Sequence, residues 1–153
     1  MLFRSPYYLS TISKKNNLKT EVTLAGRKIN DGMLNHITKQ LNYFLNKKNK
    51  TLKNSKIMIV GLTYKAGVAD MRNSLNFKIF KKIRKYNNKI YGCDPFVTKN
   101  IKTTYDIYDN VKKSAYYDVI LFLSYHKIFK KIFQNIASSK NKNKILDPFN
   151  YYS

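Results

Sequence analysis

The sequence predicts an α/β protein in which a helical N-terminal segment precedes a small Rossmann-like domain with a parallel sheet. A long amphipathic stretch near the N-terminus has helical spacing, short apolar runs of strand length follow it, and helical stretches separate those runs. Strands that alternate with helices form parallel sheets, because each helix returns the chain to the same end of the sheet. We expect residues 1–49 to be helical and residues 50–153 to form the Rossmann-like domain.

The helical segment is expected to hold two helices. A short helix follows Pro6, because proline is favoured in the first turn, and a longer helix spans Thr20–Leu45. The apolar residues at helical spacing in the longer helix are Leu24, Ile29, Met33, Ile37, Leu41 and Phe44. They form a long apolar face, which we expect to join two copies of the chain in a homodimer. The polar stretch Asn46–Ser55 is expected to be a linker.

The rest of the chain alternates between strands and helices. Strands are expected near Lys56–Gly61, Lys89–Cys93, Val119–Leu123 and Lys144–Leu146. Helices are expected near Ser74–Tyr86, Ile107–Lys113 and Lys127–Ile136. This order predicts a small doubly wound sheet, and ligands bind beyond the carboxyl ends of the strands in such sheets. The loop after the first strand is therefore the candidate site.

Length and composition indicate a single ordinary domain in a reducing compartment. The chain has 153 residues, 43% of them hydrophobic, and a single cysteine, which excludes a disulfide scaffold. The N-terminus lacks the pattern of a signal peptide, and no stretch has the roughly 20 apolar residues of a membrane span. We expect a soluble, cytoplasmic protein without a membrane partner.

The formal charge of +22 permits non-specific attraction to nucleic acid. However, only four of the 30 basic residues are arginine, and the lysines are scattered among Asn, Ile, Tyr and Phe, which A/T-rich codons encode. No zinc-finger spacing, RNA-recognition signature or Arg-rich arm accompanies them. Genome composition therefore explains the charge better than a nucleic-acid partner does, and we expect no specific nucleic-acid binding.

The loop after the first expected strand carries the most specific motifs. Gly61 ends the strand, the pair Tyr64-Lys65 follows, and an Asp-x-Arg-x-Ser element then ends at Ser74. The second expected strand ends in Asp94-Pro95. Together these elements resemble the C-terminal domain of the UDP-glucose/GDP-mannose dehydrogenase family, most closely the UDP-N-acetylhexosamine dehydrogenases. Two upstream segments, Pro6-Tyr7-Tyr8-Leu9 and Ala25–Asp31, also resemble that family.

The resemblance assigns roles to three residues. In that family the Tyr-Lys pair touches the UDP-sugar, which implies substrate binding by Tyr64 and Lys65. The arginine of Asp-x-Arg-x-Ser reaches NAD, which implies cofactor binding by Arg72, and a guanidinium forks onto two phosphate oxygens. An alternative for Arg72 is a local ion pair with Asp70, beside a helix cap at Ser74.

The resemblance also implies that the catalytic machinery lies elsewhere. The family oxidises a primary alcohol to a carboxylate by two hydride transfers to NAD, with a thiolate that holds the intermediate. The family's nucleophilic cysteine aligns with Met1, and its Gly-rich NAD-binding half has no counterpart here. Cys93 is expected to be a small core residue. We therefore expect no catalytic residue in this chain and no tight binding of NAD to it alone.

Other polar residues are weaker candidates. His36 and His126 lie far apart without a cluster of further ligands, so no metal site is expected. Asp94 and Asp147 end expected strands and precede prolines, which favours turn initiation over ligand contact. The family's C-terminal substrate-binding arginine has no counterpart after Asp147.

Two functions from different classes remain open. The first is a C-terminal fragment or subunit of an NAD-dependent UDP-sugar 6-dehydrogenase, which makes uronates for surface polysaccharides and needs a separate NAD-binding half. The alternative is a stand-alone basic binding or scaffold protein with non-specific nucleic-acid affinity.

Overall fold

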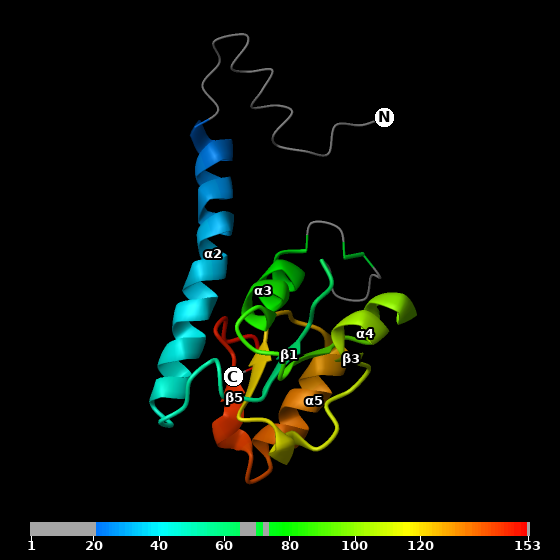
Figure 1. The fold of residues 1–153 in the computed structure, drawn as a ribbon. Helices are drawn as coiled ribbons and strands as arrows, with labels where there is room; N and C mark the ends of the chain where they lie inside the picture. The colour runs from blue at the N-terminus through cyan, green and yellow to red at the C-terminus, as the bar shows by residue number, and fades with distance from the viewer. Residues whose placement is uncertain (1–20, 65–69, 72–73, 153) are drawn as a thin grey trace. The chain divides into compact units, whose positions relative to one another are not determined.

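The computed structural model describes residues 21–64, 70–71 and 74–152, and the short helix expected after Pro6 lies outside them. The chain divides into two compact units, with the boundary between His36 and Ile37. The second unit contains the sheet, whose strands are drawn as arrows in Figure 1. The domain boundary expected near residue 50 stays a prediction.

The long N-terminal helix is confirmed as α2, Glu21–Asn46. Its last turns belong to the second unit, where Ile37, Leu41 and Leu45 are fully buried. The apolar face of this helix was expected to join two copies of the chain. At Ile37 and Leu41 that expectation is wrong, because both side chains are already covered within one chain.

The second unit is built on a five-stranded sheet in the order β3-β2-β1-β4-β5, in which every neighbouring pair is parallel. The strands are β1 Ile57–Val60, β2 Ile90–Cys93, β3 Ile107–Tyr108, β4 Val119–Phe122 and β5 Ile145–Leu146. β1 lies at the centre, with Val60 opposite both Cys93 and Phe122. The expected α/β fold class and four of the strands are therefore confirmed.

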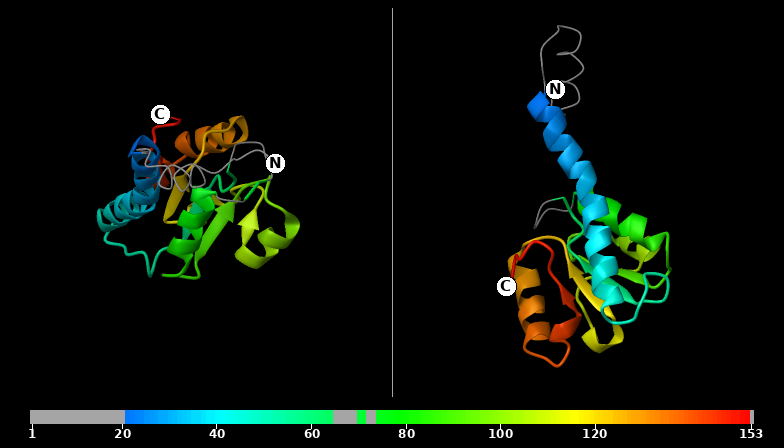
Figure 2. Two further views of the ribbon diagram at one scale, coloured as in Figure 1. Left: turned by 90° about the horizontal axis from the view of Figure 1, so that it is seen from above. Right: turned by 90° about the vertical axis from the view of Figure 1, so that its left-hand side faces the viewer.

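Helices cover both faces of this sheet. They are α3 Leu75–Arg84, α4 Lys99–Tyr105 and α5 Lys127–Ala137, with short 3₁₀ turns at Ser114–Tyr116 and Lys142–Lys144. Figure 2 shows α3 on one side of the sheet and α5 on the other. Ser74 caps α3 by accepting a hydrogen bond from the Phe77 N–H, as expected for a serine before a helix.

One expected helix is wrong. The stretch Ile107–Lys113 begins with the edge strand β3, and the helix of this region, α4, lies before it. Asp106, with φ of 53°, ends α4 in the left-handed conformation and accepts a hydrogen bond from Arg84 at 2.6 Å. Ile107 is then buried in the sheet. A strand of two residues is too short to show alternation, so its sequence resembled a helix continuation.

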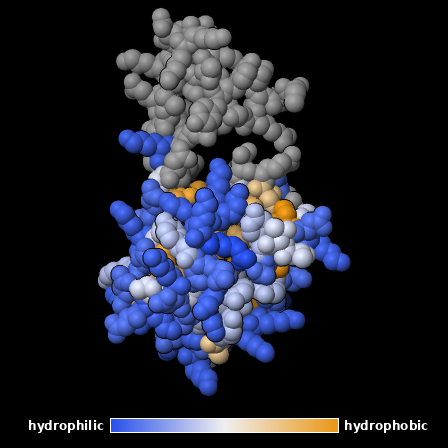
Figure 3. All heavy atoms as spheres, viewed as in Figure 1, coloured by the Kyte–Doolittle hydropathy of each residue, from blue (hydrophilic) through white to orange (hydrophobic). Residues whose placement is uncertain are grey.

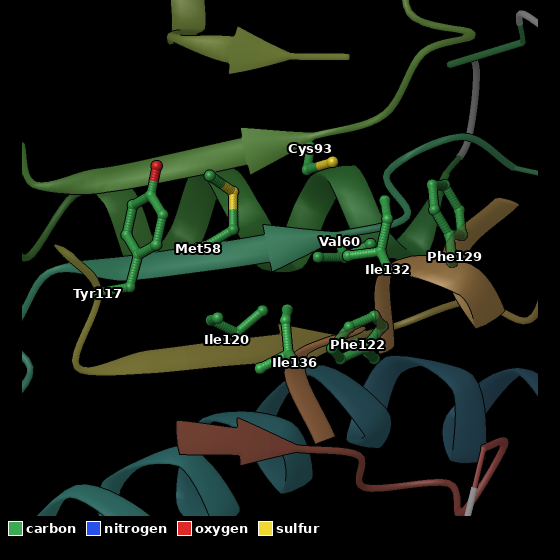
Figure 4. Packing of buried hydrophobic residues seen from close by; sticks show 9 residues of the cluster. All are labelled: Met58, Val60, Cys93, Tyr117, Ile120, Phe122, Phe129, Ile132 and Ile136. Atoms are coloured by element: carbon green, nitrogen blue, oxygen red, sulfur yellow. The ribbon is translucent and has the colours of Figure 1, made fainter. Parts of the chain in front are cut away.

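The core on the α5 side of the sheet explains why these strands and this helix pack together. Met58 and Val60 point to the same face because side chains alternate along a strand. They lie with residues of β2, β4 and α5 and with Tyr117, which precedes β4. Figure 4 shows the cluster: Met58, Val60, Cys93, Tyr117, Ile120, Phe122, Phe129, Ile132 and Ile136. The intervening residues Ile57, Ile59 and Leu121 are equally buried on the opposite face. The long apolar runs are therefore those of a sheet covered on both faces.

The surface is largely hydrophilic where Figure 3 displays described residues. Few acidic residues are available to pair with the lysines, because the chain has eight acidic and 30 basic residues. One ion pair matters for the fold: the Asp118 carboxylate accepts from the Lys50 ammonium and, at 2.8 Å, from the Lys56 backbone N–H. This contact holds the amino end of β1 beside β4.

Candidate functional site

The candidate site is the edge of the sheet at the carboxyl ends of β1, β2 and β4. All strands are parallel, so their following loops leave the same edge. Tyr64 follows β1, Asp94 follows β2 and His126 follows β4. The topology therefore brings together residues that lie about 30 positions apart in the sequence.

Gly61 allows the chain to turn sharply as it leaves β1. Its φ is 86°, and a Cβ at this position would lie 2.2 Å from Ser124 Oγ. A larger residue would meet both a strained backbone and a steric clash. Gly61 thus lets the β1 loop pass close to the end of β4.

Asp94 holds the beginning of this loop from the neighbouring strand. Its side chain is fully buried, and Oδ2 accepts from the Leu62 N–H at 2.8 Å, the Thr63 N–H at 3.0 Å and the Thr63 hydroxyl at 3.0 Å. Oδ1 accepts from the Phe96 N–H at 3.0 Å. The expected turn at Asp94-Pro95 is confirmed, since the Val97 N–H also donates to the Asp94 carbonyl at 3.4 Å. The bonds to the β1 loop were not predicted.

The other end of the loop is held by the start of α3. The Ser74 hydroxyl donates to the Leu62 carbonyl at 2.6 Å, and Asn76 donates to the Gly61 and Leu123 carbonyls at 3.0 and 3.1 Å. The Tyr64 N–H donates to the Asp70 carbonyl at 2.9 Å. These bonds close the two described ends of the loop on each other.

Of the three residues predicted to bind ligand, the structure describes only Tyr64. Its side chain is 58% exposed although residues 61–63 before it are buried. Tyr64 is therefore presented to solvent at the sheet edge by an anchored backbone. Lys65 and Arg72 lie outside the described residues, as does any ion pair between Asp70 and Arg72.

Aromatic side chains from the loops after β2 and β4 also lie at this edge. The rings of Phe96 and His126 meet edge to face, with centroids 5.2 Å apart, although they follow β2 and β4 on either side of β1. His126 Nδ1 accepts from the Ile128 N–H at 3.2 Å and so caps α5. Because this nitrogen is the acceptor, a neutral ring carries its proton on Nε2.

The C-terminal residues are tied to the same region. The Tyr152 hydroxyl donates to the Ser124 carbonyl at 2.8 Å and accepts from the His126 N–H at 2.9 Å. Burial raises the pKa of Tyr152 above its ordinary value, so its hydroxyl stays protonated and able to donate to a more alkaline pH than that of a free tyrosine. The Tyr152 ring stacks on Tyr125, which is 51% exposed. These tyrosines were not predicted, because their spacing in the sequence alone carries no signal for such a role.

Asp147 also initiates a turn, as expected. Its carbonyl accepts from the Asn150 N–H at 3.3 Å, and Oδ2 accepts from the Tyr152 N–H at 2.9 Å. The carboxylate therefore organises the C-terminal turn.

The described part of the site is suited to binding, not to covalent chemistry. Burial, with a smaller effect of the Asp94 charge, raises the pKa of the Cys93 thiol to about 12, so little nucleophilic thiolate forms at neutral pH. Cys93 lies in the core cluster, which confirms its expected structural role. Among the described residues no three His, Cys, Asp or Glu side chains are grouped to hold a metal ion. No described helix is long and apolar enough to span a bilayer.

The described edge does not fit a dinucleotide. In dinucleotide-binding folds, a Gly-rich turn approaches the pyrophosphate, and an acidic residue at the end of the second strand binds the ribose. Here Asp94 occupies that strand end, but it is buried and bonded to backbone donors. The sequence after β1 also lacks a Gly-x-Gly-x-x-Gly pattern.

Comparison with known proteins agrees with the fold and the motifs. Residues 58–153 match the model of the UDP-glucose/GDP-mannose dehydrogenase family, UDP binding domain. The UDP-N-acetyl-D-glucosamine 6-dehydrogenase of Salmonella typhi is 33% identical over 129 residues, which are 83% of this chain and 30% of that protein.

Solved structures of related enzymes share the fold. The UDP-D-ManNAc dehydrogenase from Pyrococcus horikoshii matches with a TM-score of 0.68 and 22% identity, over 92% of this chain and 32% of that chain. GDP-mannose dehydrogenase from Pseudomonas aeruginosa matches with a TM-score of 0.66 and 14% identity, over 93% of this chain and 34% of that chain. The present chain therefore spans about a third of the length of the proteins it resembles.

Proposed function

Because the chain belongs to the UDP-glucose/GDP-mannose dehydrogenase family, we propose that it is the UDP-sugar-binding part of an NAD-dependent UDP-sugar 6-dehydrogenase. Such an enzyme oxidises a UDP-hexose or UDP-N-acetylhexosamine to the uronate used in surface polysaccharides. The relative named for UDP-N-acetyl-D-glucosamine supports an N-acetylhexosamine as the sugar. The observation that carries the proposal is the exposed ring of Tyr64 on a loop whose backbone is anchored at the carboxyl edge of the sheet.

Two residues of the loop are assigned to the substrate. Tyr64 offers a ring face and a hydroxyl to the nucleotide sugar. Lys65 offers a cation to the diphosphate, whose charge an ammonium group binds well. Both assignments rest on the Tyr-Lys motif after β1, and the exposure of Tyr64 supports the first of them.

The cofactor is assigned to a different part of the enzyme. NAD supplies the hydride acceptor for the two oxidation steps. The described sheet edge does not fit a dinucleotide, so the cofactor and the thiolate that holds the intermediate belong to an NAD-binding half outside the residues described. Arg72 would reach the NAD pyrophosphate at the junction between the two halves.

Assembly and location complete the proposal. A homodimer through α2 is retained, although Ile37 and Leu41 are excluded from its interface by their burial within one chain. A cytoplasmic location agrees with the single unpaired cysteine, Cys93. Membership of the dehydrogenase family favours this function over the alternative of a basic scaffold protein.

Titration with UDP and activity assays with UDP-sugars test the proposal. The purified chain should bind UDP weakly and should bind NAD no better than a non-specific anion. It should form no NADH from UDP-glucose or UDP-N-acetylhexosamines. Turnover by this chain alone would overturn the assignment of the catalytic groups to another part.

The matched lysine variants test the site itself. Lys65→Ala should reduce UDP binding at least tenfold, because the substitution removes the assigned phosphate contact. Lys140→Ala and Lys142→Ala remove the same charge from exposed positions far along the chain and should leave binding nearly unchanged. Equal losses in all three variants would mean that UDP is attracted only by net charge.

A further inference from the structure

Asp94 is a buried carboxylate that the proposed binding chemistry does not use. It is fully buried at the end of β2, so it cannot touch a ligand in solvent. A carboxylate is rarely buried unless its oxygens are satisfied by hydrogen bonds. The donors to Asp94 come from the loop after β1 and from the loop after β2. The side chain therefore holds these two loops together at the edge of the sheet.

The bonds of Asp94 converge on the segment that leads to Tyr64. Oδ2 accepts from both consecutive backbone N–H groups, Leu62 and Thr63, and from the Thr63 hydroxyl at 3.0 Å. Tyr64 is the next residue and the first exposed one. Hydrogen bonds to an ionised acceptor are about twice as strong as neutral ones, so this clamp fixes the peptide planes immediately before Tyr64.

A second set of bonds limits the same segment from the other side. The Leu62 carbonyl accepts from the Ser74 hydroxyl at 2.6 Å, and the Gly61 carbonyl accepts from Asn76 at 3.0 Å. The N–H groups and the carbonyls of the loop are thus held by different elements, β2 and α3. Residues 61–63 therefore have little freedom to rotate their backbone, and a ligand that contacts Tyr64 loses less conformational entropy of the protein on binding.

We propose that Asp94 is a positioning residue, which holds the loop after β1 so that Tyr64 is pre-arranged to receive the nucleotide sugar. This inference rests on the proposed function, because it assigns the anchored loop to that ligand. Asp94 acts through the backbone of Leu62 and Thr63 and makes no ligand contact of its own.

Asp94→Asn tests the proposal with minimal change of shape. In the wild-type chain the donors are divided between the two carboxylate oxygens of Asp94, whereas the neutral amide of asparagine has only one oxygen that accepts. The NH₂ group of the amide must therefore face at least one backbone N–H, and these two donors cannot bond to each other. The variant should bind UDP at least fivefold more weakly than the wild-type chain. The amide proton signals of Leu62 and Thr63 should move upfield, and the backbone order parameter of Tyr64 should fall.

Asp118→Asn is the matched control. Asp118 also joins two strands by accepting from a backbone N–H, that of Lys56 at 2.8 Å, but it does so at the amino edge of the sheet. Its substitution should disturb the Lys56 amide signal, leave the order parameter of Tyr64 unchanged and keep UDP affinity within twofold. Both variants are compared in the full chain at a temperature at which each is folded.

The outcomes separate this inference from the proposed function. If the wild-type chain binds UDP and the two variants bind it equally well, the positioning role is overturned and the proposed function stands. If the wild-type chain binds no UDP, the proposed function fails. The order parameter of Tyr64 then decides: a fall confined to Asp94→Asn supports the anchoring role, and an unchanged value overturns it.

Discussion

Replacement of Leu41 by alanine should destabilise the sheet-containing unit, not a dimer. Leu41 is fully buried on α2, together with Ile37 and Leu45. Full burial of a large aliphatic side chain contributes about 1.5–3 kcal/mol, so the three residues supply about 5–9 kcal/mol in total. Since a whole domain has about 5–15 kcal/mol of stability, the last turns of α2 are needed for the fold of the sheet.

Urea unfolding of the full chain measures the effect of this substitution. Leu→Ala in a core costs about 2–5 kcal/mol. With an m-value of about 1.5 kcal/mol/M, a loss of 3 kcal/mol lowers the urea midpoint by about 2 M. Tyr43→Ala on the same helix is the control, because Tyr43 is 64% exposed, and its midpoint should change little. Equal midpoints for the two variants, or an unchanged Leu41→Ala midpoint with a lower molecular mass in light scattering, would refute the reasoning.

Three further predictions concern single residues of the fold. Gly61→Ala should lower the free energy of unfolding by at least about 1–2 kcal/mol because its φ is positive, whereas Gly32→Ala, in an exposed turn of α2 with open space around it, should be neutral or stabilising in the same urea assay. Burial raises the pKa of the Asp118 carboxyl, yet the lysine ammonium and backbone N–H that donate to it bring that pKa below its usual value of 3.8. Asp118 therefore contributes stability above about pH 4, and this contribution should be lost on acidification below that value; an Asp118→Asn variant with the same acid transition as wild type would contradict it. Cys93, whose pKa is raised to about 12, should react with a thiol reagent at pH 8 only as fast as the chain unfolds, and rapid labelling of the native chain would show that it is accessible.

The sequence predicted the elements whose periodicity is long enough to be read. The 26-residue α2 and the buried runs of β1 and β4 were found within one or two residues of their observed ends. β3 was missed because two residues cannot display a period. Its position depends on the partner strand, since the Gly92 N–H donates to the Asp106 carbonyl and the Asp94 N–H to the Tyr108 carbonyl. Such pairing is a property of the folded sheet.

The same distinction explains the outcome for α2. Helical spacing predicted which side of the helix is apolar, and Ile37 and Leu41 do lie on that side. Spacing cannot say which surface covers an apolar face, because a sheet of the same chain and a second copy of the helix bury it equally well. The structure resolves this for the last turns, where the covering surface belongs to the same compact unit.

Asp94 shows why the site was harder to predict than the fold. An Asp-Pro pair after a strand favours a turn, and that turn is present. The larger role of Asp94 arises because β1 and β2 are parallel neighbours in register, with Val60 opposite Cys93. This register places the carboxylate directly beside the N–H groups of residues 31 and 32 positions earlier. A motif in the sequence can therefore identify the residue that meets a ligand, such as Tyr64, while the residue that holds it in place becomes visible only when the strands are paired.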